Sequence, residues 1–209
     1  MSSFFGTSSF AVDSLNTTQC TVTPHDPFSL LGTVFLPSDE QDIRRSLREL
    51  VWLSYRSGFP PIGMLTCDGG WGCMYRTAQM ALANAMVRAG VGGGRGEVLC
   101  RFLDTPAAPF SLHALVSHSQ SLRKKAGDWL CPSEAAYVIS TAVERQCDLS
   151  LAVHIARNGL FSLPDITAKA AAKGRFSPTL LIAPIRLGLD NVNPLYLPSI
   201  KGELRGEKV

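Results

Sequence analysis

Residues 68–76 read Asp68-Gly69-Gly70-Trp71-Gly72-Cys73-Met74-Tyr75-Arg76, and this stretch decides the fold. Its glycines predict a tight turn, and the pattern from Met74 onward predicts an amphipathic helix. Cys73 therefore stands in the first turn of that helix, where unpaired backbone N–H groups favour a thiolate over a thiol. The same N–H groups can help to hold an oxyanion, so the stretch predicts a nucleophilic cysteine.

The alternative interpretation of Cys73 is a buried cysteine that follows a tight turn. We expect most of the six cysteines to be small buried residues. The chain is not small and no export signal is visible, so a disulfide framework is not expected. Because no Cys-x-x-Cys pair or cysteine–histidine cluster has the spacing of a zinc site, the sequence does not predict a structural zinc.

Length and composition are those of an ordinary globular protein. The chain has 209 residues, of which 45% are hydrophobic and 18% are charged, so a core of useful size can form. The net charge of +3 is too small to indicate nucleic-acid binding. The N-terminus lacks the basic and apolar regions of a secretory signal, and no run of ~18 apolar residues predicts a membrane-spanning helix.

The first half of the chain reads as mostly helical. Residues 1–28 are rich in Ser and Thr and predict a flexible N-terminal arm, which leaves 29–209 as one domain. A first helix is expected at 39–56, with Ser38 as its cap. Its apolar stripe consists of Ile43, Leu47, Leu50 and Val51. Glycines and prolines at 58–63 then predict a loop.

The helix that follows Cys73 carries the apolar positions Met74, Ala78, Ala81, Leu82, Ala85 and Met86. Gly90 is its natural end. Two further helices are expected, one at 111–126 capped by Ser111 and one that opens at Ser133. The apolar runs 149–155 and 179–185 have the length of strands. Helices that precede strands predict an α+β fold.

A cysteine nucleophile needs a base, and the chain has four histidines. His154 lies within an apolar run, which favours a hydrogen-bonded core or strand residue over a base. His113 and His118 read as surface residues of a helix, and His25 lies in the N-terminal arm. Papain-like enzymes place the base roughly 130–150 residues after the nucleophile. No histidine stands in the part of that window that the chain covers.

Four segments, in order along the chain, resemble the autophagin family, the cysteine proteases that process the ubiquitin-like autophagy modifier. The most specific of them is the stretch around Cys73, and the likeness spans residues 30–200. The segments are 52–56 with 59–63, 70–76 with 79–80 and 82–83, 128–129 with 132–133 and 150–156, and 184–189 with 193–194 and Tyr196.

The resemblance implies a papain-like fold, with a helical part packed on a β-sheet, and a role for three residues. Cys73 matches the catalytic cysteine. Tyr55 matches a tyrosine whose hydroxyl helps to stabilise the oxyanion; the alternative is an aromatic residue that closes a helix. Trp129 matches a tryptophan that covers the cleft and contacts the C-terminal glycine of the substrate; the alternative is a core or hinge residue.

The resemblance also implies an activity and a partner. Family members act in the cytoplasm and cut the modifier after its C-terminal glycine, which exposes that glycine for conjugation to phosphatidylethanolamine. They also release the modifier from the lipid. We therefore expect the precursor and lipidated forms of the modifier as partners, with no cofactor, no metal and no nucleic acid. Contact with membranes is expected through the lipidated substrate alone.

The sequence departs from the family pattern at two places. Cys67 stands where the family more often has serine. The aspartate and histidine of the family lie on an Asp-Pro-His segment beyond the region covered here, so we expect the domain at 29–209 to be incomplete. A truncated protease is the favoured interpretation, and a short pseudoenzyme that only binds the modifier is an alternative. An unrelated thiol acyltransferase with the same cysteine geometry is a third.

Loss of the later strands would have a physical consequence. A papain-like fold packs its helices against a sheet, so an incomplete sheet would expose apolar faces such as 179–185. We therefore predict poor solubility, or a binding partner, for the isolated chain. A cooperative melt of a monomer would contradict this prediction.

Overall fold

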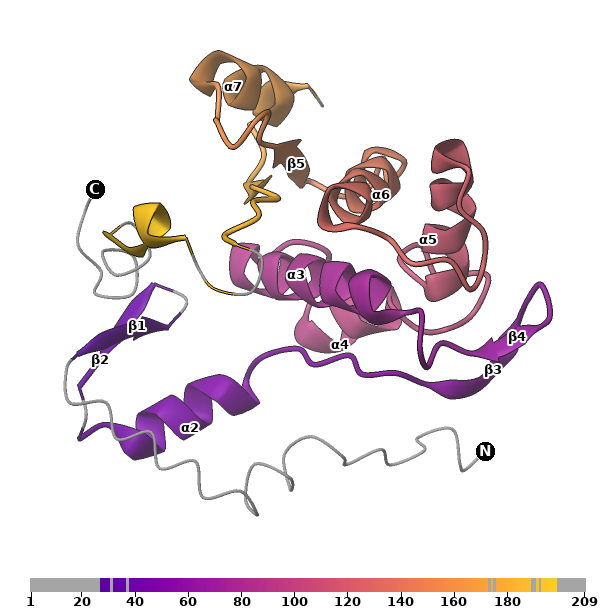
Figure 1. Ribbon diagram of the computed structural model, residues 1–209, viewed down its shortest axis with the longest axis horizontal. Coiled ribbons are helices and arrows are strands. Elements are labelled where there is room, and N and C mark those ends of the chain that lie inside the picture. Colours follow the sequence, from indigo (N-terminus) through magenta and orange to yellow (C-terminus); the bar gives the residue numbers. More distant parts are fainter. Residues whose placement is uncertain are drawn as a thin grey trace. The chain divides into compact units, whose positions relative to one another are not determined.

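A computed structural model describes residues 27–30, 32–36, 38–172, 174, 176–188, 191 and 193–198 (Figure 1). The chain divides into two compact units. The larger unit is Arg48–Arg186, and the smaller takes its described residues from Met1–Leu47 and Leu187–Val209. Most of the predicted N-terminal arm, including His25, lies outside the described residues.

The described residues of the smaller unit include a hairpin, most of a helix at Glu40–Arg48 and a short 3₁₀-helix. Strands β1 (Phe28–Leu30) and β2 (Thr33–Phe35) pair antiparallel, and the turn between them uses Gly32 at φ +80°. The 3₁₀-helix η2 (Pro194–Tyr196) begins at Asn193, whose side chain accepts a hydrogen bond from the N–H of Leu195.

Helix α2 (Glu40–Arg48) is shorter than the predicted 39–56. It begins one residue after Asp39, and Ser38 donates its hydroxyl to the Asp39 carboxylate instead of capping the helix. After α2, Val51 and Leu53 are buried while Trp52 is exposed. Such alternation of buried and exposed side chains is typical of an extended chain. Of the predicted apolar stripe only Val51 is buried, and it lies in the extended segment, whereas Leu47 in α2 is exposed. Tyr55 does not close a helix.

The predicted loop at 58–63 is in fact part of a hairpin. Strands β3 (Ser57–Ile62) and β4 (Leu65–Cys67) pair antiparallel around Gly63, with an irregularity in their register. Two prolines in β3 argued against a strand, because proline cannot donate to a ladder. A two-stranded ribbon tolerates them, since each strand has a free edge.

Helix α3 (Cys73–Ala89) begins and ends as predicted, and Gly90 ends it in the left-handed conformation at φ +61°. Its buried face differs from the predicted one, because Ala81 is exposed while Arg76 and Gln79 are buried. The buried face consists of Tyr75, Arg76, Gln79, Leu82, Ala83 and Met86. The core therefore contains a polar element that a purely apolar pattern misses.

Three helices pack on α3 or on one another: α4 (Arg95–Cys100), α5 (Leu112–Ser119) and α6 (Pro132–Glu144). Ser111 caps α5 as predicted, and its hydroxyl accepts from the N–H of Ala114 at 3.1 Å. The predicted helix at 111–126 continues only as the 3₁₀-helix η1 (Gln120–Leu122). Helix α6 begins at Pro132, one residue before the predicted start at Ser133, and Cys131 stands at its N-cap. Glu134 accepts from the Cys131 N–H at 2.7 Å and completes this cap.

The two predicted late strands form a parallel pair. Strand β5 (Ala152–Ile155) pairs with β6 (Thr179–Ile182) in the register Val153↔Leu180, and α7 (Leu163–Ala171) connects them. Helix α6 packs against β5, which joins the helical layer to the sheet. The α+β prediction is confirmed. On β6, the side chain of Leu181 is 44% exposed.

Candidate active site

Cys73 is the first residue of α3, and its side chain is half-buried. Gly72 occupies the N-cap with φ −78° and ψ −3°. Its N–H donates to the carbonyl of Asp68 at 2.8 Å, which closes the turn. Because glycine has no side-chain oxygen, it cannot bond with the first-turn N–H groups as a capping serine would. Those groups are available to an anion at the start of the helix.

Three glycines of this turn, Gly69, Gly70 and Gly72, are required to different degrees and for different physical reasons. A Cβ atom on Gly72 would lie 2.6 Å from Oδ2 of Asp68, far closer than real contacts allow. Gly70 has φ +85°, a conformation that side chains disfavour. Gly69 is less restricted, because its Cβ would make an ordinary 3.4 Å contact with Sγ of Cys67. Gly72 is thus required by the close approach of Asp68.

These contacts predict different costs for two alanine substitutions. We expect Gly72→Ala to lower the free energy of unfolding by about 1–3 kcal/mol, because the new methyl group displaces the Asp68 carboxylate. Gly69→Ala is the matched control and is expected to change it by about 0.5 kcal/mol or less. Urea unfolding of both variants measures the difference. Equal losses would show that the approach of Asp68 does not constrain the turn.

A network of charges is buried beneath the turn. Arg76 is 2% exposed, and its Nε donates to Asp68 at 2.6 Å. Its Nη1 and Nη2 donate to the two oxygens of Asp104 at 2.9 and 3.1 Å, and Nη1 also reaches Gln79 at 3.0 Å. Burial lowers the pKa of Arg76, but the hydrogen bonds to Asp104 and Asp68 outweigh it and hold that pKa above its ordinary value.

Sequence reasoning assigned no role to these charged residues. One signal was available, because Arg76 falls three positions after Cys73 on the face of the helix that must pack inward. Such a residue must pair with an acid in the fold. The sequence does not show that its partners are Asp68 and Asp104.

Tyr55 lies in the irregular segment between α2 and β3, and its side chain is 50% exposed. Two contacts fix this segment. Asn84 of α3 accepts from the Val51 N–H at 2.9 Å and donates to the Val51 carbonyl at 3.0 Å. The Arg56 N–H donates to Oδ1 of Asp68 at 2.6 Å. Tyr55 therefore stands on a backbone that is anchored on both sides, next to the residue that bonds to the cysteine turn.

Trp129 lies in the loop before α6, and its side chain is 66% exposed. Its indole Nε1–H donates to the carbonyl of Gly70, within the cysteine turn. Lys124 holds the loop from the other side, since its Nζ donates to the Trp129 carbonyl at 3.0 Å and pairs with Glu134 at 3.3 Å. The hydrogen bond from the backbone N–H of Cys131 is the main cause that lowers the pKa of Glu134. The carboxylate that pairs with Lys124 therefore stays ionised. The structure thus connects Trp129, like the Tyr55 segment, to the turn that ends at Cys73.

One aromatic side chain in the first turn of α3 is unsuited to proton transfer at neutral pH. Tyr75 is fully buried, and its hydroxyl donates to Oγ of Ser119 at 3.0 Å. Burial raises the pKa of Tyr75 and outweighs the opposing effect of the Ser119 hydrogen bond. Tyr75 is therefore a neutral structural residue.

The described histidines make their contacts away from Cys73. His154 is 7% exposed in β5, with its ring centroid 6.1 Å from that of Phe161, as expected for a strand histidine. His113 and His118 are half-buried, so their prediction as surface residues is wrong. Nε2 of His113 lies 2.6 Å from the carbonyl of Pro60. Burial, aided by a nearby arginine, lowers the pKa of His118.

The prediction that most cysteines are buried is also wrong for the described part of the chain. The five described cysteines are free thiols, and Cys73 is less exposed than the others. The exposed ones lie at or beyond the ends of helices and strands, where side chains meet solvent. They are Cys67, Cys100, Cys131 and Cys147.

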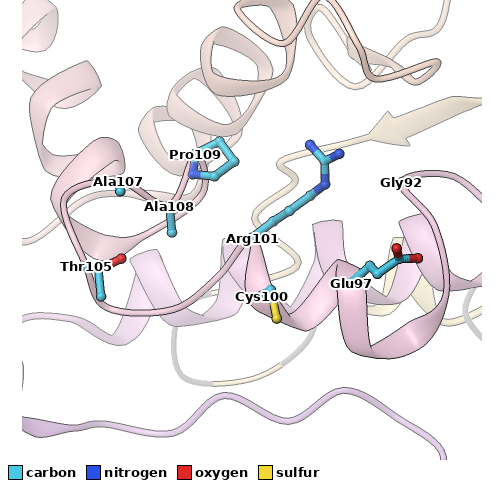
Figure 2. A pocket seen from close by; sticks show the side chains of 8 residues that line it. All are labelled: Gly92, Glu97, Cys100, Arg101, Thr105, Ala107, Ala108 and Pro109. Carbon is cyan, nitrogen blue, oxygen red and sulfur yellow. The ribbon is translucent and has the colours of Figure 1, made fainter.

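A separate hollow of about 520 Å³ lies beside α4. Figure 2 shows its two sides, with Glu97, Cys100 and Arg101 on or next to the helix and, on the facing loop, Thr105, Ala107, Ala108 and Pro109. It contains none of the three predicted site residues. In the described residues, no three His, Cys, Asp or Glu side chains form a metal-binding group, and no helix is long and apolar enough to cross a bilayer.

A half-buried cysteine at the start of a core helix, preceded by a glycine turn in an α+β domain, is the arrangement expected of a papain-like cysteine peptidase. The family model described as the Peptidase C54 catalytic domain matches residues 40–208. The chain belongs to this family of cysteine peptidases. The predicted resemblance to the autophagins is thereby confirmed.

Curated relatives agree with the family match. The probable cysteine protease ATG4 of Pichia angusta is 33% identical over 203 residues, which cover 78% of this chain and 40% of the relative. That of Sclerotinia sclerotiorum is 34% identical over 192 residues, which cover 74% of this chain and 44% of the relative. That of Schizosaccharomyces pombe is 34% identical over 148 residues, which cover 70% of this chain and 45% of the relative. The chain spans less than half the length of these relatives.

Proposed function

We propose that this chain carries the nucleophile of a cytoplasmic protease that cleaves the ubiquitin-like autophagy modifier after its C-terminal glycine. The same protease releases the modifier from phosphatidylethanolamine and uses no cofactor. The observation that carries the proposal is Cys73 at the open start of α3, in a turn to which the Tyr55 segment and Trp129 are both bonded. Membership of the Peptidase C54 family supports it.

The proposed reaction is acyl transfer to Cys73. The thiolate attacks the carbonyl carbon of the modifier's glycine, and the first-turn N–H groups of α3 and the Tyr55 hydroxyl donate to the resulting oxyanion. Collapse expels the amine of the downstream peptide or of the lipid, which takes up a proton, and leaves a thioester on Cys73. Water then attacks the thioester and restores the thiol. The resemblance assigns both proton transfers to the histidine of the Asp-Pro-His segment.

Trp129 is proposed to select glycine at the cleavage site. Its exposed ring is held beside the cysteine turn by the hydrogen bond to Gly70. A flat ring above an extended chain leaves room for a residue without a side chain. A substrate with a larger residue at that position would have to displace the indole and lose this hydrogen bond.

A cleavage assay with the full-length protein tests the function. The substrate is the modifier with a reporter domain after its glycine, and intact-mass analysis identifies the new C-terminus. We expect cleavage after glycine, with a substrate that carries alanine there cut at least about tenfold more slowly. Added hydroxylamine distinguishes hydrolysis from acyl transfer to amines. Cleavage elsewhere, or a product that forms only with an amine acceptor, would contradict the proposal.

A second candidate function is binding of the modifier without cleavage. Among the described residues, the contacts of His113 and His154, which lie with Pro60 and Phe161, favour it. The isolated chain should then bind the modifier and leave it intact. Trp129→Ala is expected to weaken binding at least about tenfold, since exposed tryptophans are frequent anchors. Tyr137→Ala, at another exposed aromatic residue, is the matched control. Turnover by the isolated chain would exclude this candidate.

A further inference from the structure

Asp68 connects three parts of the candidate site. Its side chain is fully buried, with Oδ1 accepting from the Arg56 N–H and Oδ2 accepting from Nε of Arg76, each at 2.6 Å. Its backbone N–H donates to the Arg56 carbonyl at 3.2 Å, and its carbonyl accepts from the Gly72 N–H at 2.8 Å. One residue thus binds the segment after Tyr55, the cysteine turn and helix α3.

We propose that Asp68 is a positioning residue that holds the Tyr55 backbone in register with the turn that presents Cys73, while Arg76 neutralises its charge. Asp68 acts through Arg56 and Gly72 and does not touch the substrate. The inference rests on the proposed function, because Tyr55 and Cys73 must then act on the same substrate carbonyl.

The carboxylate suits this position better than its closest substitutes. Two N–H donors approach different oxygens of Asp68, so both oxygens must be acceptors. An asparagine would turn its NH₂ group toward one of these donors. A glutamate would need space for a further methylene, but the Cα of Gly72 already lies so close that an added Cβ would be 2.7 Å from Cβ of Asp68. Gly72 and Asp68 are therefore complementary in shape.

The charge of Asp68 explains the need for Arg76. The carboxylate lies against Gly72, one residue before the nucleophile, and an unpaired negative charge there would oppose a thiolate. Arg76 cancels this charge and, with Arg56, also cancels that of Asp104. The network therefore has two cations and two anions.

Other charges act on the same helix start. Asp128 and Glu134 influence Tyr75 in the first turn of α3, and Lys124 pairs with Glu134. None of these groups changes in the variants below, so their electrostatic effect on the Cys73 thiolate is the same in every variant.

The first test is the pH dependence of Cys73 alkylation by iodoacetamide in the full-length protein, followed by peptide mass spectrometry. We expect Asp68→Asn to lower the midpoint of the reaction, because a negative charge is lost. Arg76→Gln should raise it, because Asp68 loses its cation. Each shift should be at least about half a pH unit. Asp148→Asn, at an exposed ion pair with Arg101, should leave the midpoint unchanged.

Opposite shifts separate the proposed role from a loss of structure. Unfolding would move both variants toward the same value, that of a free cysteine at about 8.5. A shift of both variants in one direction would overturn the electrostatic part of the inference. If Arg76→Gln does not fold, Arg56→Gln supplies a milder loss of positive charge, because that side chain is 35% exposed.

The second test addresses positioning in the full-length protein. Asp68→Asn is expected to lower kcat at least about tenfold with KM changed by about threefold or less, since contacts with the substrate are retained. Tyr55→Phe should then lower kcat much less in the Asp68→Asn background than in the wild-type protein, because the hydroxyl is already out of register. Independent, multiplicative losses would overturn the inference.

Failure of the inference and failure of the proposed function give different results. If the wild-type protein does not cleave the modifier, the proposed function fails, and alkylation of Cys73 still tests the Asp68–Arg76 pair. If the wild-type protein cleaves it while Asp68→Asn and Arg76→Gln alkylate with the wild-type pH profile, the inference alone fails.

Discussion

Cys73→Ala in the full-length protein is expected to reduce the rate of modifier cleavage at least about 10⁴-fold. The substitution removes the sulfur that would form the thioester. Cys131 also stands at a helix start, but it is exposed, and its Sγ contacts Oγ of Ser133 at 3.1 Å. An alanine methyl group also fits the half-buried position without strain, so the fold should be retained. Initial rates of reporter release, measured at equal protein concentration, give the comparison.

The control for this prediction is Cys147→Ser, at an exposed thiol that follows α6. It should keep the wild-type rate within about twofold. Cys73→Ala should also retain binding of the modifier, because binding does not require the nucleophile. A variant that still cleaves at a tenth of the wild-type rate would show that Cys73 is not the nucleophile and would remove the basis of the proposed mechanism.

Arg76→Met is expected to lower the free energy of unfolding by about 3–5 kcal/mol. Arg76 and Asp68 are almost entirely buried, and Asp104 is 7% exposed. Removal of the guanidinium leaves two carboxylates in the core with the half-exposed Arg56 as their remaining cation. A methionine keeps most of the volume, so the loss reports the missing charge more than a cavity. Urea or thermal unfolding of the full-length protein measures it.

Arg101→Met is the matched control for Arg76→Met. Arg101 pairs with Asp148 at 2.8 Å, but the Asp148 side chain is 60% exposed to water. Water compensates a carboxylate that loses its partner there, so we expect a loss of about 1 kcal/mol or less. Similar losses for the two variants would show that burial does not amplify the effect of the Arg76 network.

Local signals predicted the parts of the fold that depend on neighbouring residues. The start of α3 at Cys73 and its end at Gly90 follow from a glycine turn and a left-handed glycine. The cap of α5 at Ser111 follows from a hydroxyl three residues before an N–H donor. Strands β5 and β6 follow from short apolar runs. Each of these features is decided within a few positions of the chain.

Predictions failed where distant contacts decide the conformation. The predicted helix at 39–56 ends at Arg48. The chain beyond it is extended, because the side chain of Asn84 forms hydrogen bonds with both the N–H and the carbonyl of Val51. The predicted α3 stripe included Ala81 but not Arg76, because the acidic partners of that arginine come from other parts of the chain. Periodicity alone does not reveal such partners.

The sequence alone determined the position of the proposed nucleophile, because a cysteine after a glycine turn acquires its setting from the first turn of its own helix. Only the tertiary structure decided what surrounds it. The Arg56 N–H, the indole of Trp129 and the carboxylate of Asp104 reach the turn or its helix from 12, 59 and 28 positions away. Buried donors and charges must find partners wherever the fold brings them, and that distance in sequence is the reason no local pattern reveals the pairs.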